Sequence, residues 1–85
     1  MEYTKGEWEV QPYGNGDFYV QSSLGRDITH VHSYTVDRGS HIARANAQLI
    51  ALSPKMAKLL KHMVEDGWST AIAIEAKEIL QTLDL

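Results

Sequence analysis

The sequence predicts an α+β domain, in which a three-stranded antiparallel β-meander precedes two or three α-helices packed on one face of the sheet. Six of the seven aromatic residues lie within the first 34 positions, whereas alanine and leucine concentrate in the second half. Apolar residues recur at every second position up to about Ser40 and at every third or fourth position after it, the spacings of a strand and a helix. Aromatic residues favour strands, and alanine and leucine favour helices. The strands of the sheet are therefore expected to precede the helices along the chain.

Length and composition limit how this fold is stabilised. A chain of 85 residues buries only roughly 60–65% of the surface that its unfolded form exposes. It has no cysteine, so neither a disulfide framework nor a thiolate zinc site can support it. We therefore expect a single domain over 1–85, with the meander at 7–34 and the helical part at 41–83, that self-associates as a homodimer.

The first hairpin is predicted in register. Apolar and polar residues alternate over 8–12 and again over 17–21, which gives each strand one apolar face. A two-residue Asn-Gly turn would place the two apolar faces on opposite sides of the sheet. A three-residue loop at 14–16 unites them by pairing Val10 with Val20. Because a slip of one residue reverses every side chain, we predict the three-residue loop, with a positive φ at its last glycine.

The third strand, expected at 27–34, has a less regular pattern. Strict alternation places Ile28, His30 and His32 on one face and Val31 on the other. Either a β-bulge or a sheet that is covered on both faces would account for apolar residues on both sides. The pattern leaves both possibilities open, and with them the face that carries the histidines.

Three helices are expected, at 41–52, 54–66 and 70–83. Ser53 and Pro54 favour a break between the first two, because serine caps helix N-termini and proline suits the first helical position. In the first helix, an apolar stripe is expected at Ile42, Ala45, Leu49 and Leu52, with Asn46 partly buried on the same face.

The turn before the last helix is predicted to contain a glycine cap. Gly67 suits the left-handed conformation that ends many helices, and Ser69 is the expected N-cap of the next helix. Trp68 is expected to pack back on Met63 as the hydrophobic contact of a Schellman motif. If Trp68 is exposed instead, it becomes the best candidate for a contact with a partner.

The segment before and after Ser53-Pro54 resembles a known pattern. Residues 44–56 read Arg-Ala-Asn-Ala-Gln-Leu-Ile-Ala-Leu-Ser-Pro-Lys-Met, and they follow a Gly-Glu-Trp at 6–8 and a Gly-Arg-Asp-Ile-Thr-His-Val at 25–31. Small uncharacterised bacteriophage and prophage proteins have a similar order of Gly-Pro-Trp, Gly-Arg-x-Ile-Ala-x-Val and Glu-Ala-Asn-Ala-Arg-Leu-Ile-Ala-Ala-Ala-Pro-Glu-Leu-Leu. The resemblance covers about residues 5–64. It implies a phage ancestry and carries over no functional residue.

His30 and His32 are the weak metal-ligand candidates. Residues two apart on a strand point the same way, so His41 or Asp37 would complete a three-ligand site with them. A His-x-His pair is also an ordinary feature of a polar strand face. We therefore predict no metal and no other cofactor.

A basic helix face is the only signal for nucleic acid. Lys55, Lys58 and Lys61 fall on one stretch of helix and, with Trp68, are the candidate partner-binding residues. The net charge of -3 and the pI near 5.7 disfavour binding to phosphate backbones. A solvated helix face is therefore the preferred interpretation, and a nucleic-acid-associated accessory protein is the alternative.

Signals of catalysis and of membrane insertion are lacking in the sequence. It has no glycine-rich phosphate loop before a helix, no cysteine nucleophile and no serine in a strand-turn-helix elbow. Its apolar runs are far shorter than a membrane span, and the N-terminal residues lack the apolar core of a signal peptide. We therefore expect a cytoplasmic, non-enzymatic protein that binds an unknown protein partner and itself.

Overall fold

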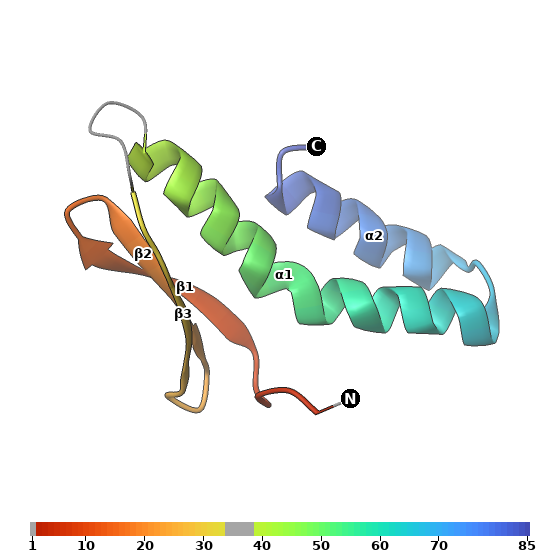
Figure 1. Cartoon of the computed structure of the whole chain (residues 1–85). Coiled ribbons are helices and arrows are strands. Elements are labelled where there is room, and N and C mark those ends of the chain that lie inside the picture. The colour runs from red at the N-terminus through yellow and green to blue at the C-terminus, as the bar shows by residue number, and fades with distance from the viewer. Residues whose placement is uncertain (1, 34–38) are drawn as a thin grey trace. The chain divides into compact units, whose positions relative to one another are not determined.

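The computed structural model of the chain describes residues 2–33 and 39–85, without the side chains of 39 and 40 (Figure 1). Its elements, in chain order, are β1 (Trp8–Gly14), β2 (Asp17–Ser22), β3 (Asp27–Val31), α1 (Gly39–Asp66) and α2 (Thr70–Thr82). The three strands form one antiparallel sheet in the order β1-β2-β3. The α+β fold and the meander are thus confirmed. The third strand is shorter than predicted, because it ends at Val31 and His32 and Ser33 follow it. The predicted end at Tyr34 and the candidate ligand Asp37 lie outside the described residues.

The chain comprises two compact units. The first, Met1–Ala51, contains the sheet and the first half of α1, and we call it the sheet unit. The second, Leu52–Leu85, contains the rest of α1 and α2, and we call it the hairpin unit. The single-domain organisation expected from the chain length stays a prediction.

The β1–β2 hairpin has the predicted register, but a different turn produces it. Val10 pairs with Val20, as expected, and Gly14 pairs with Asp17. Only Asn15 and Gly16 therefore form the turn, both with positive φ (50° and 80°), as a type I′ turn requires. Tyr13 is an extra residue, a β-bulge that restores the pairing of the apolar faces. The predicted three-residue loop was wrong because the bulge gives the same pairing of Val10 with Val20 together with a two-residue turn.

A second bulge resolves the pattern of β3. Val20 pairs with Thr29, but Gln21 pairs with Asp27, so Ile28 is an extra residue on β3. Val31 consequently lies on the core face of the sheet, where it is buried with Val20. The opposite face, which we call the outer face, carries His30 opposite Tyr19.

A buried serine shapes the turn between β2 and β3. Ser22 is 2% exposed, and its hydroxyl accepts hydrogen bonds from the backbone N–H groups of Leu24 (3.2 Å) and Arg26 (3.3 Å). Its own N–H donates to the Arg26 carbonyl at 2.7 Å. One side chain thus satisfies two backbone donors that the turn would otherwise leave without a partner.

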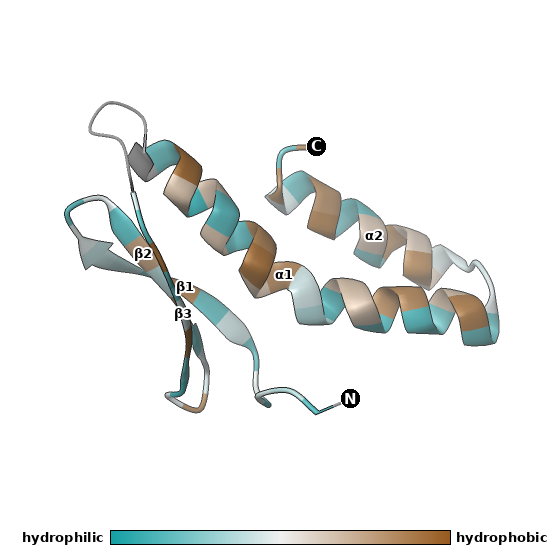
Figure 2. Cartoon of the chain, in the orientation of Figure 1, coloured by the Kyte–Doolittle hydropathy of each residue, from teal (hydrophilic) through white to brown (hydrophobic). Residues whose placement is uncertain are grey.

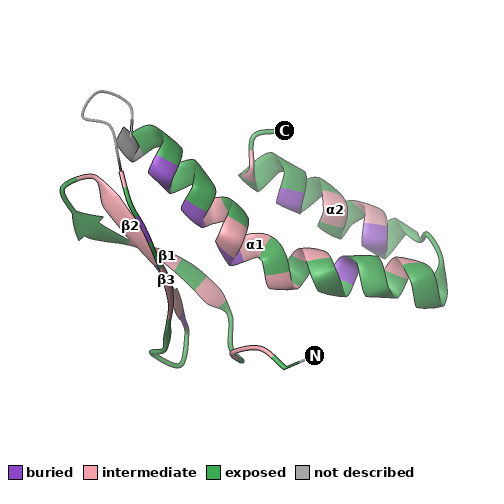
Figure 3. Ribbon diagram, viewed as in Figure 1, coloured by how far each residue is buried: buried purple, intermediate pink, exposed green. Residues whose placement is uncertain are grey.

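The core of the sheet unit is built from small residues on the helix side. Val20 and Val31 pack with Ala43, Ala47 and Ala51, which are spaced four apart on one face of α1 (Figure 3). Alanine has no side chain beyond Cβ, so the helix backbone can lie close to the sheet.

The apolar stripe expected on this helix was therefore wrong. Ile42 and Leu49 are 55% and 50% exposed, and Asn46 is exposed rather than partly buried. The large side chains lie away from the sheet because the alanines occupy the face that packs on it.

The break expected at Ser53-Pro54 is absent, because α1 runs without interruption from Gly39 to Asp66 with Pro54 inside it. Proline lacks the N–H that a helix interior uses and its ring crowds the preceding turn, so this position costs stability. The helix formers on both sides and the packing of each half sustain one helix of 28 residues.

The hairpin unit is an antiparallel pair of helices around a small core of Leu59, Ile72 and Ile79. The Ser69 hydroxyl accepts from the Ile72 N–H at 3.2 Å, which confirms the predicted N-cap, and α2 ends within one residue of its expected position. Gly67 has the predicted positive φ (74°).

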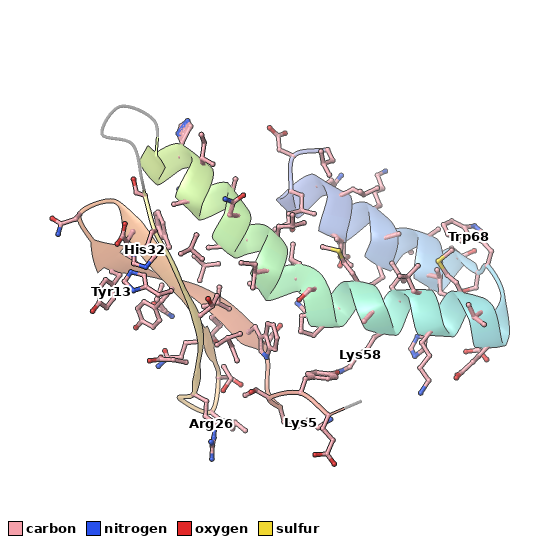
Figure 4. All side chains as sticks on the ribbon, viewed as in Figure 1. Lys5, Tyr13, Arg26, His32, Lys58 and Trp68 are labelled. Carbon is pink, nitrogen blue, oxygen red and sulfur yellow. The ribbon has the colours of Figure 1, made fainter. Side chains whose placement is uncertain are left out.

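The Schellman contact of Trp68 was wrong. The Gly67 N–H donates to the Met63 carbonyl at 3.1 Å, which is the single bond of the simpler αL cap. Trp68 is 66% exposed, and Figure 4 shows it at the turn between α1 and α2. The αL cap does not draw the next residue back onto the helix, so the tryptophan side chain stays in solvent.

Candidate functional site

Three potential ligands meet on the outer face of the sheet. Asp17 is the first residue of β2, immediately after the Asn-Gly turn, and His30 and His32 come from β3 and the residues that follow it. The Asp17 Oδ2 atom lies 3.1 Å from His30 Nε2 and 3.4 Å from His32 Nδ1. One donor atom from each of the three side chains lies within 4.8 Å of the other two.

The backbone holds the Asp17 carboxylate in place. Its second oxygen, Oδ1, accepts a hydrogen bond of 2.7 Å from the N–H of Ser33. This bond, followed by the interactions with His30 and His32, lowers the pKa of Asp17 from its usual value. The carboxylate is therefore ionised well below neutral pH, with Oδ2 directed at the two imidazoles.

Aromatic rings surround the histidines. The His30 and His32 rings are stacked at 4.1 Å between centroids, with 24° between their planes. The Tyr13 ring lies 4.3 Å from that of His30 and meets Tyr19 edge-on at 5.9 Å. Figure 4 shows Tyr13 and His32 at the same end of the sheet. Alternation from Pro12, which pairs with Phe18 on the core face, places this ring on the outer face.

A shallow hollow of about 710 Å³ lies beside the cluster. Tyr13, Tyr19 and His30 line one part of it, and Gln21 and Asp27 add polar groups. The hollow lies on the sheet surface, so an ion or molecule bound by the three side chains could exchange with solvent there. Two imidazole nitrogens and a carboxylate oxygen are a donor set that divalent transition metals use.

The sequence predicted part of this cluster. His30 and His32 are brought together as expected, but among the described residues the third potential ligand is Asp17, whereas His41 is not part of the group. Sequence reasoning missed Asp17. Strand alternation alone places Asp17 on the same face as Tyr19 and Gln21. The pairing of β2 with β3 is needed to show that this face lies beside the histidines.

The candidate basic face is interrupted by acidic residues. Lys55 and Lys58 lie with Glu75 and Glu78 along one groove of the hairpin unit. Lys61 forms an exposed ion pair with Glu65 at 3.8 Å. Nucleic-acid binding requires an uninterrupted run of positive potential. The mixture of charges supports the interpretation of a solvated helix face.

Large apolar side chains are exposed on the hairpin unit, where Figure 2 shows apolar bands on both helices. Most of the exposed large apolar residues in the described part of the chain belong to this unit, namely Leu60, Val64, Trp68, Ile74, Leu80 and Leu85. Val64 is 87% exposed. Exposed apolar side chains are thus concentrated in the hairpin unit rather than in the sheet unit.

Comparison of the chain with protein-family models, with curated proteins and with solved structures finds no match. Within the part of the chain that the structure describes, neither helix has both the length and the apolar character needed to cross a membrane.

Proposed function

We propose that this protein is a non-enzymatic interaction protein that self-associates, as a homodimer, through its hairpin unit. The observation that carries the proposal is the exposure of six large apolar side chains on a unit of only 34 residues, 52–85. Exposed apolar side chains cost free energy that burial in an interface recovers, at about 25 cal/mol per Å².

The size of the hairpin unit supports this proposal. Segments below about 40 residues rarely bury enough apolar surface to hold a fold without a disulfide, a metal or a partner. The buried core of this unit consists of Leu59, Ile72 and Ile79, and the chain has no cysteine. A further apolar surface would complete the core.

A second copy of the chain is the partner that best fits this surface. Two helical hairpins can pair about a two-fold axis into a four-helix bundle, a stable arrangement for helices with one apolar side each. The groove that holds Lys55 and Lys58 beside Glu75 and Glu78 carries both signs of charge. Such a surface can pair with itself without the repulsion that a surface of one sign would cause.

Light scattering of the full chain at micromolar concentration tests the proposal. The wild type is expected at twice the chain mass of 9.5 kDa. Leu60→Glu and Val64→Glu should shift it toward the monomer, because each places a charge in the apolar interface. The control is Leu24→Glu, which changes an equally exposed leucine in the sheet unit and should leave the dimer intact. A wild type at 9.5 kDa, or a Leu24→Glu variant that dissociates as readily, would refute it.

The origin and location of the protein complete the proposal. The likeness of residues 44–56 to a phage and prophage pattern supports a phage-derived accessory protein, and neighbouring phage genes in the source genome would test it. The lack of cysteine is compatible with a cytoplasmic location, because no disulfide would have to persist in a reducing environment. A fluorescent fusion would show where the protein resides.

A further inference from the structure

We propose that Asp17, His30 and His32 form a binding site for a divalent transition-metal ion, with Zn²⁺ as the reference ion. The site lies in the sheet unit, so it is independent of the self-association proposed for the hairpin unit. It rests on the convergence of three side chains from separate positions of β2, β3 and the segment after β3.

Two of the three distances between the potential ligand atoms already suit a metal ion. Bonds of 2.0–2.2 Å at tetrahedral angles separate neighbouring ligand atoms by about 3.3–3.5 Å. The Asp17 Oδ2 atom is 3.1 Å from His30 Nε2 and 3.4 Å from His32 Nδ1. Two of the three edges of the ligand triangle are thus within a few tenths of an ångström of the required length. The third, between the two histidines, is at most 4.8 Å.

The remaining adjustment is a rotation of the imidazole rings. A metal ion lies in the plane of each imidazole that binds it, whereas the His30 and His32 rings are stacked with 24° between their planes. The χ2 torsion of histidine is broad and costs little to turn. Metal binding should therefore separate the stacked rings and change the contact of His30 with Tyr13, which gives the site a spectroscopic signature.

The surroundings of the carboxylate resemble those of metal-binding carboxylates. Ligands of metal ions are usually oriented by hydrogen bonds to their other atoms. The Ser33 N–H does this for Asp17, because it engages Oδ1 and leaves Oδ2 for the cluster. The carboxylate is thus fixed before an ion arrives, and binding loses little side-chain entropy.

The donor set selects the class of ion. Mg²⁺ and Ca²⁺ prefer shells of oxygen atoms, whereas imidazole nitrogens suit Zn²⁺, Ni²⁺, Co²⁺ and Cu²⁺. Three protein ligands leave at least one coordination position for water or for a donor from another molecule. The His30 and His32 side chains are 35% and 51% exposed, so this position is accessible.

Calorimetric titration of the untagged full chain with ZnCl2 tests the site. We expect saturable binding of one ion per chain, no competition from excess Mg²⁺, and a loss of affinity of at least about tenfold in Asp17→Asn and in His32→Gln. Asn keeps an oxygen for the Ser33 N–H, so the first variant should stay folded, which circular dichroism checks. The control is His62→Gln, an exposed histidine of the hairpin unit that should leave affinity unchanged.

A second readout reports geometry rather than affinity. Co²⁺ bound to the wild type should give visible absorption bands that Asp17→Asn and His32→Gln lose, and Zn²⁺ should shift the NMR signals of the His30, His32 and Tyr13 rings. No saturable Zn²⁺ binding by the wild type would overturn the proposal. So would equal affinity in the ligand variants, or a loss in His62→Gln as large as in them.

Discussion

The Asp17 side chain connects two segments of the sheet unit through its two carboxylate oxygens. The residue follows the Asn-Gly turn of the first hairpin, and its two oxygens contact different groups. Oδ1 accepts from the backbone of Ser33, beyond the end of β3, whereas Oδ2 faces His30 and His32. A single side chain thus links the start of one strand to the end of another and sets the electrostatics of the outer face.

This linkage should make the fold sensitive to acid. The pKa of Asp17 is lowered in the folded chain, chiefly by the Ser33 N–H, from a usual value of 3.8. A lowered pKa adds stability above the unfolded value, and this stability is lost as pH falls through the folded value. The urea midpoint of Asp17→Asn should therefore lie below that of the wild type at pH 7, and the difference should shrink as the pH falls below 3.8 and through the lowered pKa of folded Asp17. A difference that stays constant with pH would contradict this.

Gly67 and Trp68 are adjacent residues whose substitution by alanine should affect stability to different extents. Gly67 has a φ of 74°, and a Cβ added there would meet no atom within 4 Å, so Gly67→Ala should cost about 1 kcal/mol through backbone strain alone. Trp68→Ala should change the free energy of unfolding by less than about 0.5 kcal/mol, because the side chain is exposed. Both are measured by urea unfolding at a concentration below dimer dissociation. A large loss in Trp68→Ala would show that the ring is buried.

Among the elements, the strands show where prediction from sequence succeeds and where it ends. The alternation of β1 and β2 was sufficient to predict that Val10 pairs with Val20. The site was not predictable in the same way. Continuing the Gln21–Asp27 pairing without a bulge would place Asp17 opposite Val31 and turn the histidines toward the core. Only the extra residue at Ile28 moves the register, and no local preference of the sequence marks it.

The long helix shows the reverse case, in which a strong local signal was overridden. Ser-Pro is typical of a helix start, yet α1 continues through Pro54. Helix formers on both sides and separate packing on each side maintain the helix. The alanine face of the first half escaped prediction because alanines lie on both sides of α1, with Ala43 buried and Ala45 exposed, whereas the larger Ile42 and Leu49 side chains were expected inside.

Substitution of this proline distinguishes the two interpretations. Within a continuous helix, Pro54→Ala restores a backbone N–H and removes a steric conflict, and both changes stabilise the folded chain. Alanine also gives the unfolded chain more conformational freedom, which offsets part of this gain. The net effect should be a rise of about 1–2 kcal/mol in the free energy of unfolding. If Pro54 instead begins a separate helix, the substitution should be neutral or destabilising. Ser53→Ala is the companion variant, which should cost about 1 kcal/mol only if Ser53 is an N-cap. Thermal unfolding of both variants gives the answer.

At the scale of the whole molecule, the two units differ in how well they enclose their own apolar surface. The sheet unit has a buried cluster of two valines and three alanines, covered from the sheet and from α1. The hairpin unit has three buried residues and twice as many large apolar side chains exposed. The α+β class was predictable because periodicity is a property of long segments. The assembly was predicted from the length and composition of the chain, and it stays a prediction that light scattering can test.

The bulge at Tyr13 has a consequence for how the gene could change. Tyr13 is the one residue of β1 that has no partner on β2, so loss of its codon would leave Val10 opposite Val20 and Asp17 at the start of β2. Most single-codon deletions in a strand reverse every side chain beyond them. Here, a deletion would remove the ring that lies against His30 while leaving Asp17, His30 and His32 where they are. Tyr13 can therefore be lost without displacing the three polar side chains beside it.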